Sequence, residues 1–335
     1  MKRYEIDDLI EKIRDCVERH SLGTPGAYRR YTVGEKKDDG VNEYGVADAA
    51  NILYTIGDFP RDAETRQGFV SVLQGMQDPE TGLFTEATHH PVHTTAHCTA
   101  SLELFDAAPL YPCYAYAHLL EKEALYDYLQ NEIRWDTDPW RDSHLGAGLL
   151  PIFVNTGMAD LKWKDLYFDW MWEHSDPETG FIFAGKEKRA EPHHYMAGGF
   201  HYFFNHEAEH RPFRYPERVI DSCLSLMRDG IDGKIETAPM VRYCSFIDID
   251  VVYCLTRAMR KTAHRFDECM KMLAEYEAAY VANMYRVAGE EDYYFNDLHC
   301  LFAAVCCLAE LQQALPGTII TEQPLRLVLD RRPFI

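Results

Sequence analysis

The sequence lacks the features that would place the protein in a membrane or on nucleic acid. No apolar run approaches the about 20 residues that cross a bilayer, and the N-terminal segment MKRYEIDDLIEKIRDCVERH has no uninterrupted apolar stretch of the kind found in signal peptides. Basic residues are few, because 34 Lys and Arg stand against 54 Asp and Glu, which gives a formal net charge of −20. Nucleic acid and anionic membranes require a basic surface, so we expect no nucleic acid and no membrane as partners, and a cytoplasmic protein.

The sequence also lacks a cysteine motif, a linker and a low-complexity tract. The ten cysteines form no CxxC pair and no disulfide framework. Apolar runs contain Cys98, Cys254, Cys300, Cys306 and Cys307, so we expect reduced thiols that pack as small hydrophobic side chains. Without a Ser-, Gly- or Pro-rich linker at which to divide the chain, we predict a single domain over residues 1–335.

What the sequence does contain is a repeat of about fifty residues. The segment YGVADAANILYTIGDFP at 44–60 aligns without a gap with HTTAHCTASLELFDAAP at 93–109. Similar segments open at His144, His194, Ser245 and Phe295. All are apolar and rich in small residues, as expected of helices that are buried on all sides. We predict inner helices near residues 43–57, 92–106, 143–157, 193–208, 245–260 and 295–314.

Longer amphipathic segments lie between the inner ones, and the N-terminal segment supplies the first. The others cover residues 63–77, 114–133, 161–174, 216–228 and 263–285. Alternation of outer and inner helices predicts an all-α fold, the (α/α)6 toroid, in which six helical hairpins form a double ring. An open solenoid is the alternative, but its ends need polar capping repeats, and the last inner segment is among the most apolar in the chain. Residues 315–335 are expected to form a C-terminal strap.

The loops that enter the inner helices are the predicted location of function. Two of them share the motif DPETG, at 78–82 and 176–180, in which Asp and Pro start a turn and Gly takes the position with positive φ. Because the inner helices are expected to run parallel, their N-termini gather at one end of the barrel. Free N–H groups and helix dipoles there favour anionic ligands.

Polar residues recur at these helix starts in the same register. His93, His144 and His194 occupy equivalent positions in three repeats, and Tyr44 is their counterpart in the first. Around them lie Glu43, Phe84, His89, His90, Asp142, Phe183, His193, Tyr195, Tyr243, Asp248, Asp250, Asn296, Asp297 and His299. A histidine at a helix start can also be a cap or a satisfied core group, but the shared register predicts a site for a small molecule.

Imidazoles and carboxylates among aromatic rings suit acid–base chemistry on a sugar. Asp248 and Asp250 differ in direction by about 200° on a helix, so only one of them is expected to face the axis. We predict Asp248, Asp250, His194, Tyr195 and Asp142 as the catalytic group, with the rest of the layer binding substrate.

Two other chemistries stay open at this point. A metal could bind His93 and His97, which are four residues apart on one helix; however, HExxH is absent and no third ligand is fixed, so we predict no metal and no cofactor. Carbocation chemistry in an aromatic cavity is the second option.

The repeat FVSVLQGMQDPETGLFTEATHHPVHTTAHCTASLELF resembles two groups of (α/α)6 toroids. One comprises the terpenoid cyclases and the protein prenyltransferase β-subunits. The other comprises six-hairpin carbohydrate enzymes, among them the unsaturated glucuronyl hydrolases and the N-acylglucosamine 2-epimerases. Where the cyclases carry DxDDTA, this chain has Asp248-Ile249-Asp250-Val251-Val252, which lacks the third carboxylate and the Thr.

The resemblance implies three functions. The first is a carbohydrate-active enzyme, a hydrolase, lyase or epimerase, acting as a monomer or homodimer on a small saccharide such as a uronate. An isoprenoid enzyme is the second, and a non-catalytic ligand-binding toroid is the third. Because the resemblance lies in the repeat rather than in a catalytic motif, it is specific for the fold and not for the function.

Overall fold

The computed structural model describes residues 2–34, 40–237, 240–289 and 294–335, and the chain in these ranges is almost entirely helical. Fourteen α-helices and two short 3₁₀ helices lie in the described ranges, where the strands are two segments of two residues each. The prediction of a mostly helical chain is confirmed.

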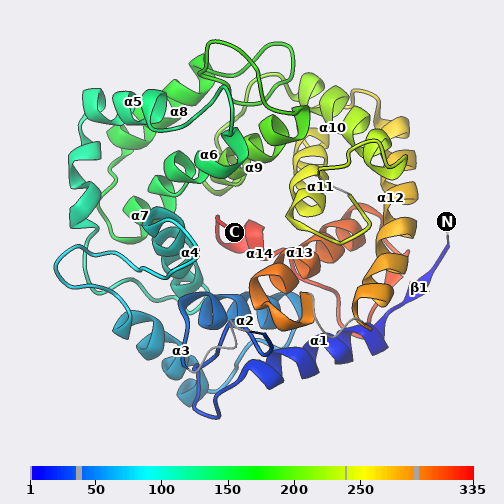
Figure 1. Cartoon of the computed structure of the whole chain (residues 1–335), viewed down its shortest axis with the longest axis horizontal. Helices are drawn as coiled ribbons and strands as arrows, with labels where there is room; N and C mark the ends of the chain where they lie inside the picture. Colours follow the sequence, from blue (N-terminus) through cyan, green and yellow to red (C-terminus); the bar gives the residue numbers. More distant parts are fainter. Residues whose placement is uncertain (1, 35–39, 238–239, 290–293) are drawn as a thin grey trace.

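Helices occupy the six segments in which the repeat predicts inner helices. They are α2 (Glu43–Ile56), α4 (Pro91–Glu103), α6 (Pro139–Ala147) with α7 (Leu149–Asn155), α9 (Pro192–Ala208), α11 (Phe246–Met259) and α13 (Leu298–Ala314). Each packs against the next, from α2 through α4, α7, α6, α9 and α11 to α13, and α13 packs against α2. The order of contacts therefore returns to its start, and Figure 1 shows these helices around the centre of the molecule.

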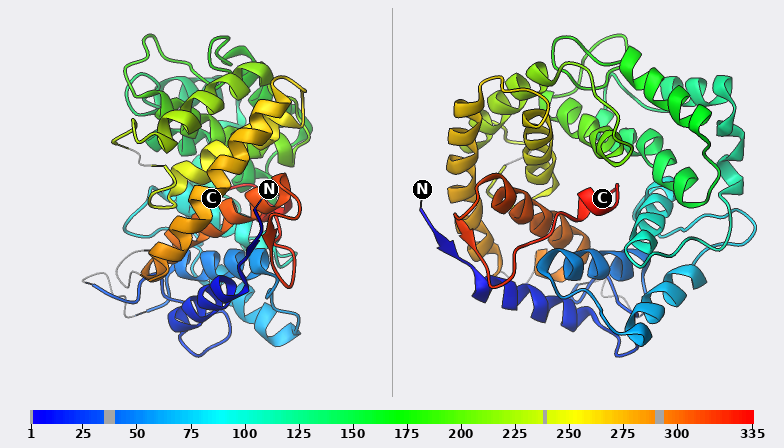
Figure 2. Two further views of the ribbon diagram at one scale, coloured as in Figure 1. Left: turned by 90° about the vertical axis from the view of Figure 1, so that its right-hand side faces the viewer. Right: turned by 180° about the vertical axis from the view of Figure 1, so that it is seen from behind.

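The amphipathic segments lie at the periphery in Figures 1 and 2. They form α1 (Asp7–His20), α3 (Ala63–Gly75), the 3₁₀ helix η1 (Tyr114–Leu120) with α5 (Lys122–Asn131), α8 (Leu161–Glu173), α10 (Pro216–Ile231) and α12 (Phe266–Val287). A second short 3₁₀ helix, η2, covers Tyr294–Asn296. In α1, for example, Leu9, Ile13 and Cys16 are buried, and this apolar face packs against α2.

The third inner segment is two helices rather than the single helix predicted near 143–157. It begins earlier, at Pro139, and is interrupted at Gly148. Pro151 causes the interruption, because it has no N–H to donate to the carbonyl of Ala147 four residues earlier. That carbonyl accepts a hydrogen bond of 2.8 Å from Nδ2 of Asn205 on α9 instead.

The two DPETG segments are turns, as predicted. Gly82 and Gly180 have φ of 75° and 82°, values that favour glycine. The Asp78 carboxylate accepts from the backbone N–H of Thr81 at 2.9 Å, and Asp176 does the same for Thr179 at 3.2 Å. Both turns thus hold the loops that lead to α4 and α9.

The C-terminal segment returns to the middle of the molecule. Strand β2 (Ile319–Ile320) pairs in parallel with β1 (Tyr4–Glu5), and the short helix α14 (Val328–Arg331) follows. In Figure 1 α14 lies at the centre, inside the inner helices. Phe334 and Ile335 are buried there.

Most of the cysteine side chains are buried, as their places in apolar runs of the sequence indicate. All ten cysteines are free thiols, and nine of them are buried. Among the described residues, no helix is both long and apolar enough to cross a lipid bilayer.

A buried ion pair joins α14 to the inner helices and provides a test of the fold. Arg257 on α11 donates two hydrogen bonds of 2.7 Å to Glu310 on α13 and one of 2.7 Å to Asp330 on α14. Glu310→Ala leaves the guanidinium buried without its main partner, so we expect the free energy of unfolding to fall by about 3–5 kcal/mol in chemical denaturation.

Glu187→Ala is the control for that variant, because Glu187 pairs with Arg189 on the exposed surface. In Glu187→Ala the free energy of unfolding is expected to fall by less than about 1 kcal/mol. Equal losses in the two variants would show that the Arg257 cluster does not hold the helices together.

Candidate active site

A cavity of about 810 Å³ lies where the inner helices begin. Residues at or near the starts of α4, α6, α9, α11 and α13 line it, together with the loops before α2 and α4 and the end of the C-terminal segment. The lining consists of Arg30, Ala87, Thr88, His89, His90, His93, Asp138, Trp140, Arg141, Asp142, His144, Leu145, His194, Phe200, His201, Phe246, Asp250, His299 and Ile335.

Proline at the helix starts sets the register of the histidines. Pro91 and Pro192 occupy the first positions of α4 and α9, where the missing N–H costs nothing. His93 and His194 follow each proline by two residues and both line the cavity. In the third repeat Pro139 begins the helix earlier, so His144 lies in its second turn and Asp142 in its first.

Eight of the predicted site residues line this cavity. They are His89, His90, His93, Asp142, His144, His194, Asp250 and His299. Their roles stay predictions, but the structure brings together residues separated by as many as 210 positions in the sequence.

Asp248 and Asp250 lie differently, as their spacing indicates. Asp250 lines the cavity and Asp248 does not. Asp248 forms a capping box with Ser245, accepts from the backbone N–H of Val241 at 2.6 Å and accepts a hydrogen bond from the Tyr276 hydroxyl. Burial raises the pKa of Asp248 to about 6, although the hydrogen bonds from these donors lower it. Its contacts fix the start of α11, so its predicted catalytic role gains no support from its placement.

Tyr195 and Phe183 also lie outside the lining. The Tyr195 hydroxyl donates to the carbonyl of Asp136 at 3.1 Å and accepts from the N–H of Ala190 at 3.1 Å. The Phe183 ring meets the Tyr195 ring edge-on, with centroids 5.6 Å apart. Both rings therefore pack the loop before α9, and Tyr195 is not placed for proton transfer in the cavity.

The remaining predicted residues lie behind or beside the cavity wall. Tyr44 and Phe84 are fully buried, and His193 is buried against Trp140 and His194. The Asn296 side chain accepts from the Thr32 hydroxyl at 2.6 Å. Glu43, Tyr243 and Asp297 are partly exposed and are not among the cavity-lining residues.

A buried carboxylate on α2 supports the histidine side of the cavity. Asp48 is fully buried and accepts from Nε2 of His97 at 2.7 Å and from Nδ1 of His299 at 3.1 Å. Burial alone would raise the pKa of Asp48, but the imidazoles of His299 and His97 outweigh it and lower the pKa below its ordinary value. Burial lowers the pKa of His97 to about 4, so this imidazole is neutral at pH 7.

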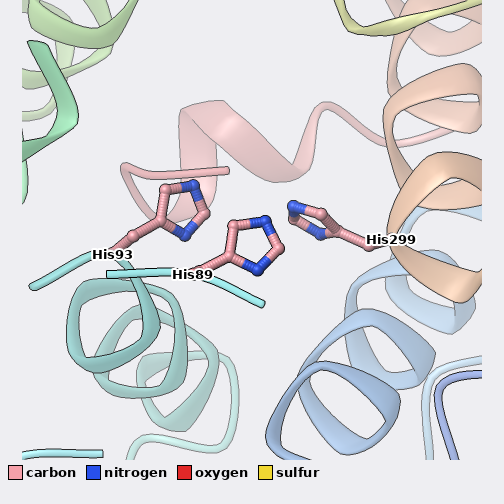
Figure 3. A group of neighbouring side chains, drawn as sticks. All are labelled: His89, His93 and His299. Carbon is pink, nitrogen blue, oxygen red and sulfur yellow. The ribbon is translucent and has the colours of Figure 1, made fainter. Parts of the chain in front are cut away.

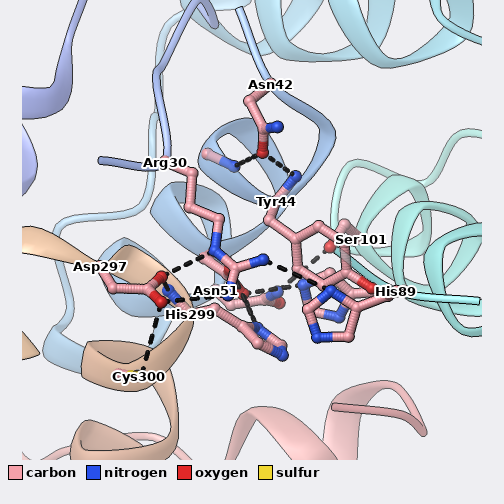
Figure 4. A network of polar contacts seen from close by, with 12 residues as sticks. Arg30, Asn42, Tyr44, Asn51, His89, Ser101, Asp297, His299 and Cys300 are labelled. Carbon is pink, nitrogen blue, oxygen red and sulfur yellow. Dashed lines mark hydrogen bonds and ion pairs between the residues drawn. The ribbon is translucent and has the colours of Figure 1, made fainter. Parts of the chain in front are cut away.

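Arg30 supplies a cation to the same wall (Figure 4). It donates to both carboxylate oxygens of Asp297, at 2.8 and 3.0 Å, and to the Thr88 hydroxyl at 2.8 Å. Its guanidinium also lies 4.9 Å from the centroid of the Tyr44 ring. The ion pair thereby connects the loop before α2 with the start of α13.

The sequence-based site omits Asp48 and Arg30, for different reasons. Asp48 occupies the same repeat position as His97, 49 residues before it; a charged residue inside an apolar helix was a signal that could have identified it. Arg30 lies in the loop before α2 and belongs to no motif or repeat position, so only the folded chain places it.

Asp250 differs from Asp142, the other predicted carboxylate of the cavity lining, because its environment opposes ionisation. It is buried, and its Oδ2 atom has no hydrogen-bond partner among the described residues. Burial, followed by the nearby charge of Asp248, raises the pKa of Asp250 well above its ordinary value. Asp142, by contrast, accepts from Arg134 at 2.6 and 2.8 Å, and its pKa is lowered.

Two imidazoles of the cavity, those of His144 and His201, have lowered pKa values. Burial and the neighbouring His90 lower the pKa of His144 to about 4, and burial lowers that of His201 to about 3. His201 is bound through Nδ1 to the Ser143 hydroxyl at 2.7 Å, whereas Nε2 of His144 makes no hydrogen bond within the described ranges. Asp250, with its raised pKa, and His144, with its lowered pKa, are an acid and a base whose environments have moved their pKa values apart.

Comparison with known proteins does not assign this site. No protein-family model, no curated protein and no solved structure matches the chain. The function must therefore be argued from the side chains of the cavity.

The raised pKa of Asp250 predicts how stability depends on pH. Above about pH 4, where an unfolded Asp ionises, Asp250 in the native protein keeps a proton that the unfolded chain releases, so the contribution of Asp250 to stability falls as pH rises. Asp250→Asn does not titrate. The stability of the variant relative to wild type should therefore increase between pH 4 and 7, by up to about 1.4 kcal/mol per pH unit.

Urea unfolding of both proteins across this pH range measures the difference. If the difference in unfolding free energy between Asp250→Asn and wild type is the same at pH 4 and pH 7, Asp250 is ionised in the native state.

Proposed function

We propose that residues 1–335 form a single (α/α)6 toroid domain. The repeat of about fifty residues, the alternation of peripheral and central helices, and the packing of α13 on α2 support this assignment. An open solenoid would leave the first and last inner helices apart, whereas here they are in contact.

We propose that the protein is an enzyme that acts on a small saccharide by acid–base catalysis. The observation that carries this proposal is the Asp250 carboxyl group, which is buried, has a raised pKa and has no hydrogen-bond partner at Oδ2 among the described residues, in a cavity that seven histidines help to line. An uncharged carboxyl group is the proton donor that cleavage of a glycosidic bond requires.

In this proposal Asp250 donates the proton and a neutral imidazole accepts one. His144 is the acceptor, since its Nε2 atom is unpartnered and its pKa is about 4. Asp142 stays anionic because Arg134 occupies both of its oxygens; its charge lies two residues from His144 and stabilises the imidazolium that forms.

The rest of the lining suits a small, polar and anionic sugar. A cavity of about 810 Å³ lies within the usual range for small-molecule sites. Trp140 and Phe246 offer aromatic rings, and Arg141 offers a cation for a carboxylate. A uronate-type saccharide fits this combination, and hydrolysis, elimination or epimerisation are the reactions that an acid–base pair can perform on it.

The lining favours a saccharide over an isoprenoid substrate. Carbocation chemistry needs a dry wall of aromatic rings, but Trp140, Phe200 and Phe246 stand among seven histidines here. The polar lining also contains atoms of His144 and Asp250 that have no hydrogen-bond partner among the described residues and are open to a polar ligand.

Activity measurements test the proposal directly. Purified protein is incubated with unsaturated uronyl disaccharides and with hexosamines, and product formation is followed. Asp250→Asn removes the proton donor, so we expect kcat to fall by about 10²–10⁴-fold.

Asp248→Asn is the matched comparison, because it removes a carboxylate two positions away that does not line the cavity. It should lower stability while leaving kcat of the folded protein near the wild-type value. Turnover that survives Asp250→Asn would contradict the acid assignment, and turnover of no saccharide would contradict the substrate class.

A further inference from the structure

Three imidazoles converge on the wall of the cavity. His89 comes from the loop before α4, His93 from its first turn and His299 from the first turn of α13. One ring nitrogen of each lies within 4.8 Å of the other two, and Figure 3 shows the three rings turned toward one another. Nitrogens on one tetrahedral zinc are about 3.4 Å apart, so side-chain shifts of about 1 Å would complete a ligand set.

Each of the three rings is held from behind through its Nδ1 atom. Nδ1 of His89 lies 3.0 Å from Oε1 of Glu86, and Nδ1 of His299 lies 3.1 Å from Oδ2 of Asp48. Nδ1 of His93 lies 2.6 Å from the Tyr44 hydroxyl. Oxygen partners of this kind orient the imidazoles of metal sites and leave Nε2 for the ion.

The charges behind the rings favour a cation. The side chains of Glu86 and Asp48 each place a carboxylate oxygen against Nδ1 of one of the rings. Arg30 is the cation on this wall, with Nη1 3.4 Å from Nδ1 of His89, but Asp297 binds it through two hydrogen bonds and offsets its charge. The surroundings of the three imidazoles are thus negative overall.

Other combinations of ligands fit less well. Asp48, His97 and His299 also lie within 4.8 Å of one another, but Asp48 and His97 are fully buried, do not line the cavity and already bind each other at 2.7 Å. The pair His93 and His97 has ring centroids 6.4 Å apart, and Nε2 of His97 is committed to Asp48. The hydrogen bond between Asp48 and His97 therefore orients side chains behind the cavity wall and does not provide a second metal site.

We propose that His89, His93 and His299 bind a divalent first-row transition metal ion, with zinc as the reference ion. Three imidazoles are a ligand set that suits this class of ion. All three residues line the cavity, so at least one coordination position faces it and takes a water molecule or a hydroxyl or carboxylate oxygen of a small molecule. The site goes beyond the acid–base proposal, because it adds a Lewis acid to the same cavity.

Metal binding is measured on protein freed of metal with a chelator. Zn²⁺ is titrated by calorimetry, Co²⁺ by visible absorption, and the zinc complex is examined by X-ray absorption. We expect one ion per chain, with three imidazole nitrogens at about 2.0–2.1 Å.

Variants separate ligands from their surroundings. His89 is partly exposed, so His89→Ala should fold normally, as circular dichroism would show, and lower zinc affinity by more than about 100-fold. Tyr44→Phe keeps the ring but removes the oxygen behind His93, and should lower affinity by about 10–100-fold. His194→Gln is the control, because His194 lines the cavity but lies outside the trio, and it should bind zinc like wild type.

Absence of stoichiometric zinc or cobalt binding would overturn the site, as would zinc without imidazole ligands. Equal affinities of wild type, His89→Ala and Tyr44→Phe would also overturn it. Because no saccharide is present in these measurements, failure here is distinguishable from failure of the acid–base proposal.

Discussion

The burial of Asp48 is the constraint on which the candidate site depends. A carboxylate inside an apolar helix is costly unless hydrogen-bond donors compensate its charge. Here the donors are His97, from the second repeat, and His299, from the last. To satisfy Asp48, α2 must lie between α4 and α13, and that contact joins the beginning of the chain to its end.

Asp250 and His144 differ from the residues of the α2 side that position the cavity wall. On the α2 side, Asp48, Tyr44 and Arg30 all have partners, and their hydrogen bonds fix the rings that face the opening. On the other side, Asp250 and His144 have atoms without partners and displaced pKa values. Such groups are costly to maintain, and they are typical of positions where a ligand or a reacting group supplies the missing contact.

Much of the helical framework was predictable from the repeat. Segments rich in small apolar residues recur about every fifty residues, and this spacing can be recognised from the sequence alone. The starts of α2, α4, α9 and α11 also lie within one residue of their predicted positions. The interruption at Gly148 was missed although Pro151 lies in the sequence; only the fold shows that Asn205 takes over the freed carbonyl.

The site was predictable as a layer but not residue by residue. Helical geometry indicated that Asp248 and Asp250 diverge, but which of them faces the cavity depends on contacts from Val241 and Tyr276. Tyr195 directly follows His194 in the sequence and yet packs a loop. Arg30 lacked any pattern, because its position results from a contact with Asp297, 267 residues away.

A double-mutant cycle between Asp48 and His299 tests the central claim most directly. Unfolding free energies of Asp48→Ala, His299→Ala and the double variant give the coupling between residues 251 positions apart. We predict a coupling energy of at least about 1 kcal/mol. The same cycle between Asp48 and His206, which packs against Phe168 instead, should give nearly additive losses. Additive losses for Asp48 and His299 as well would contradict the account, because the two ends of the chain would then not meet through this carboxylate.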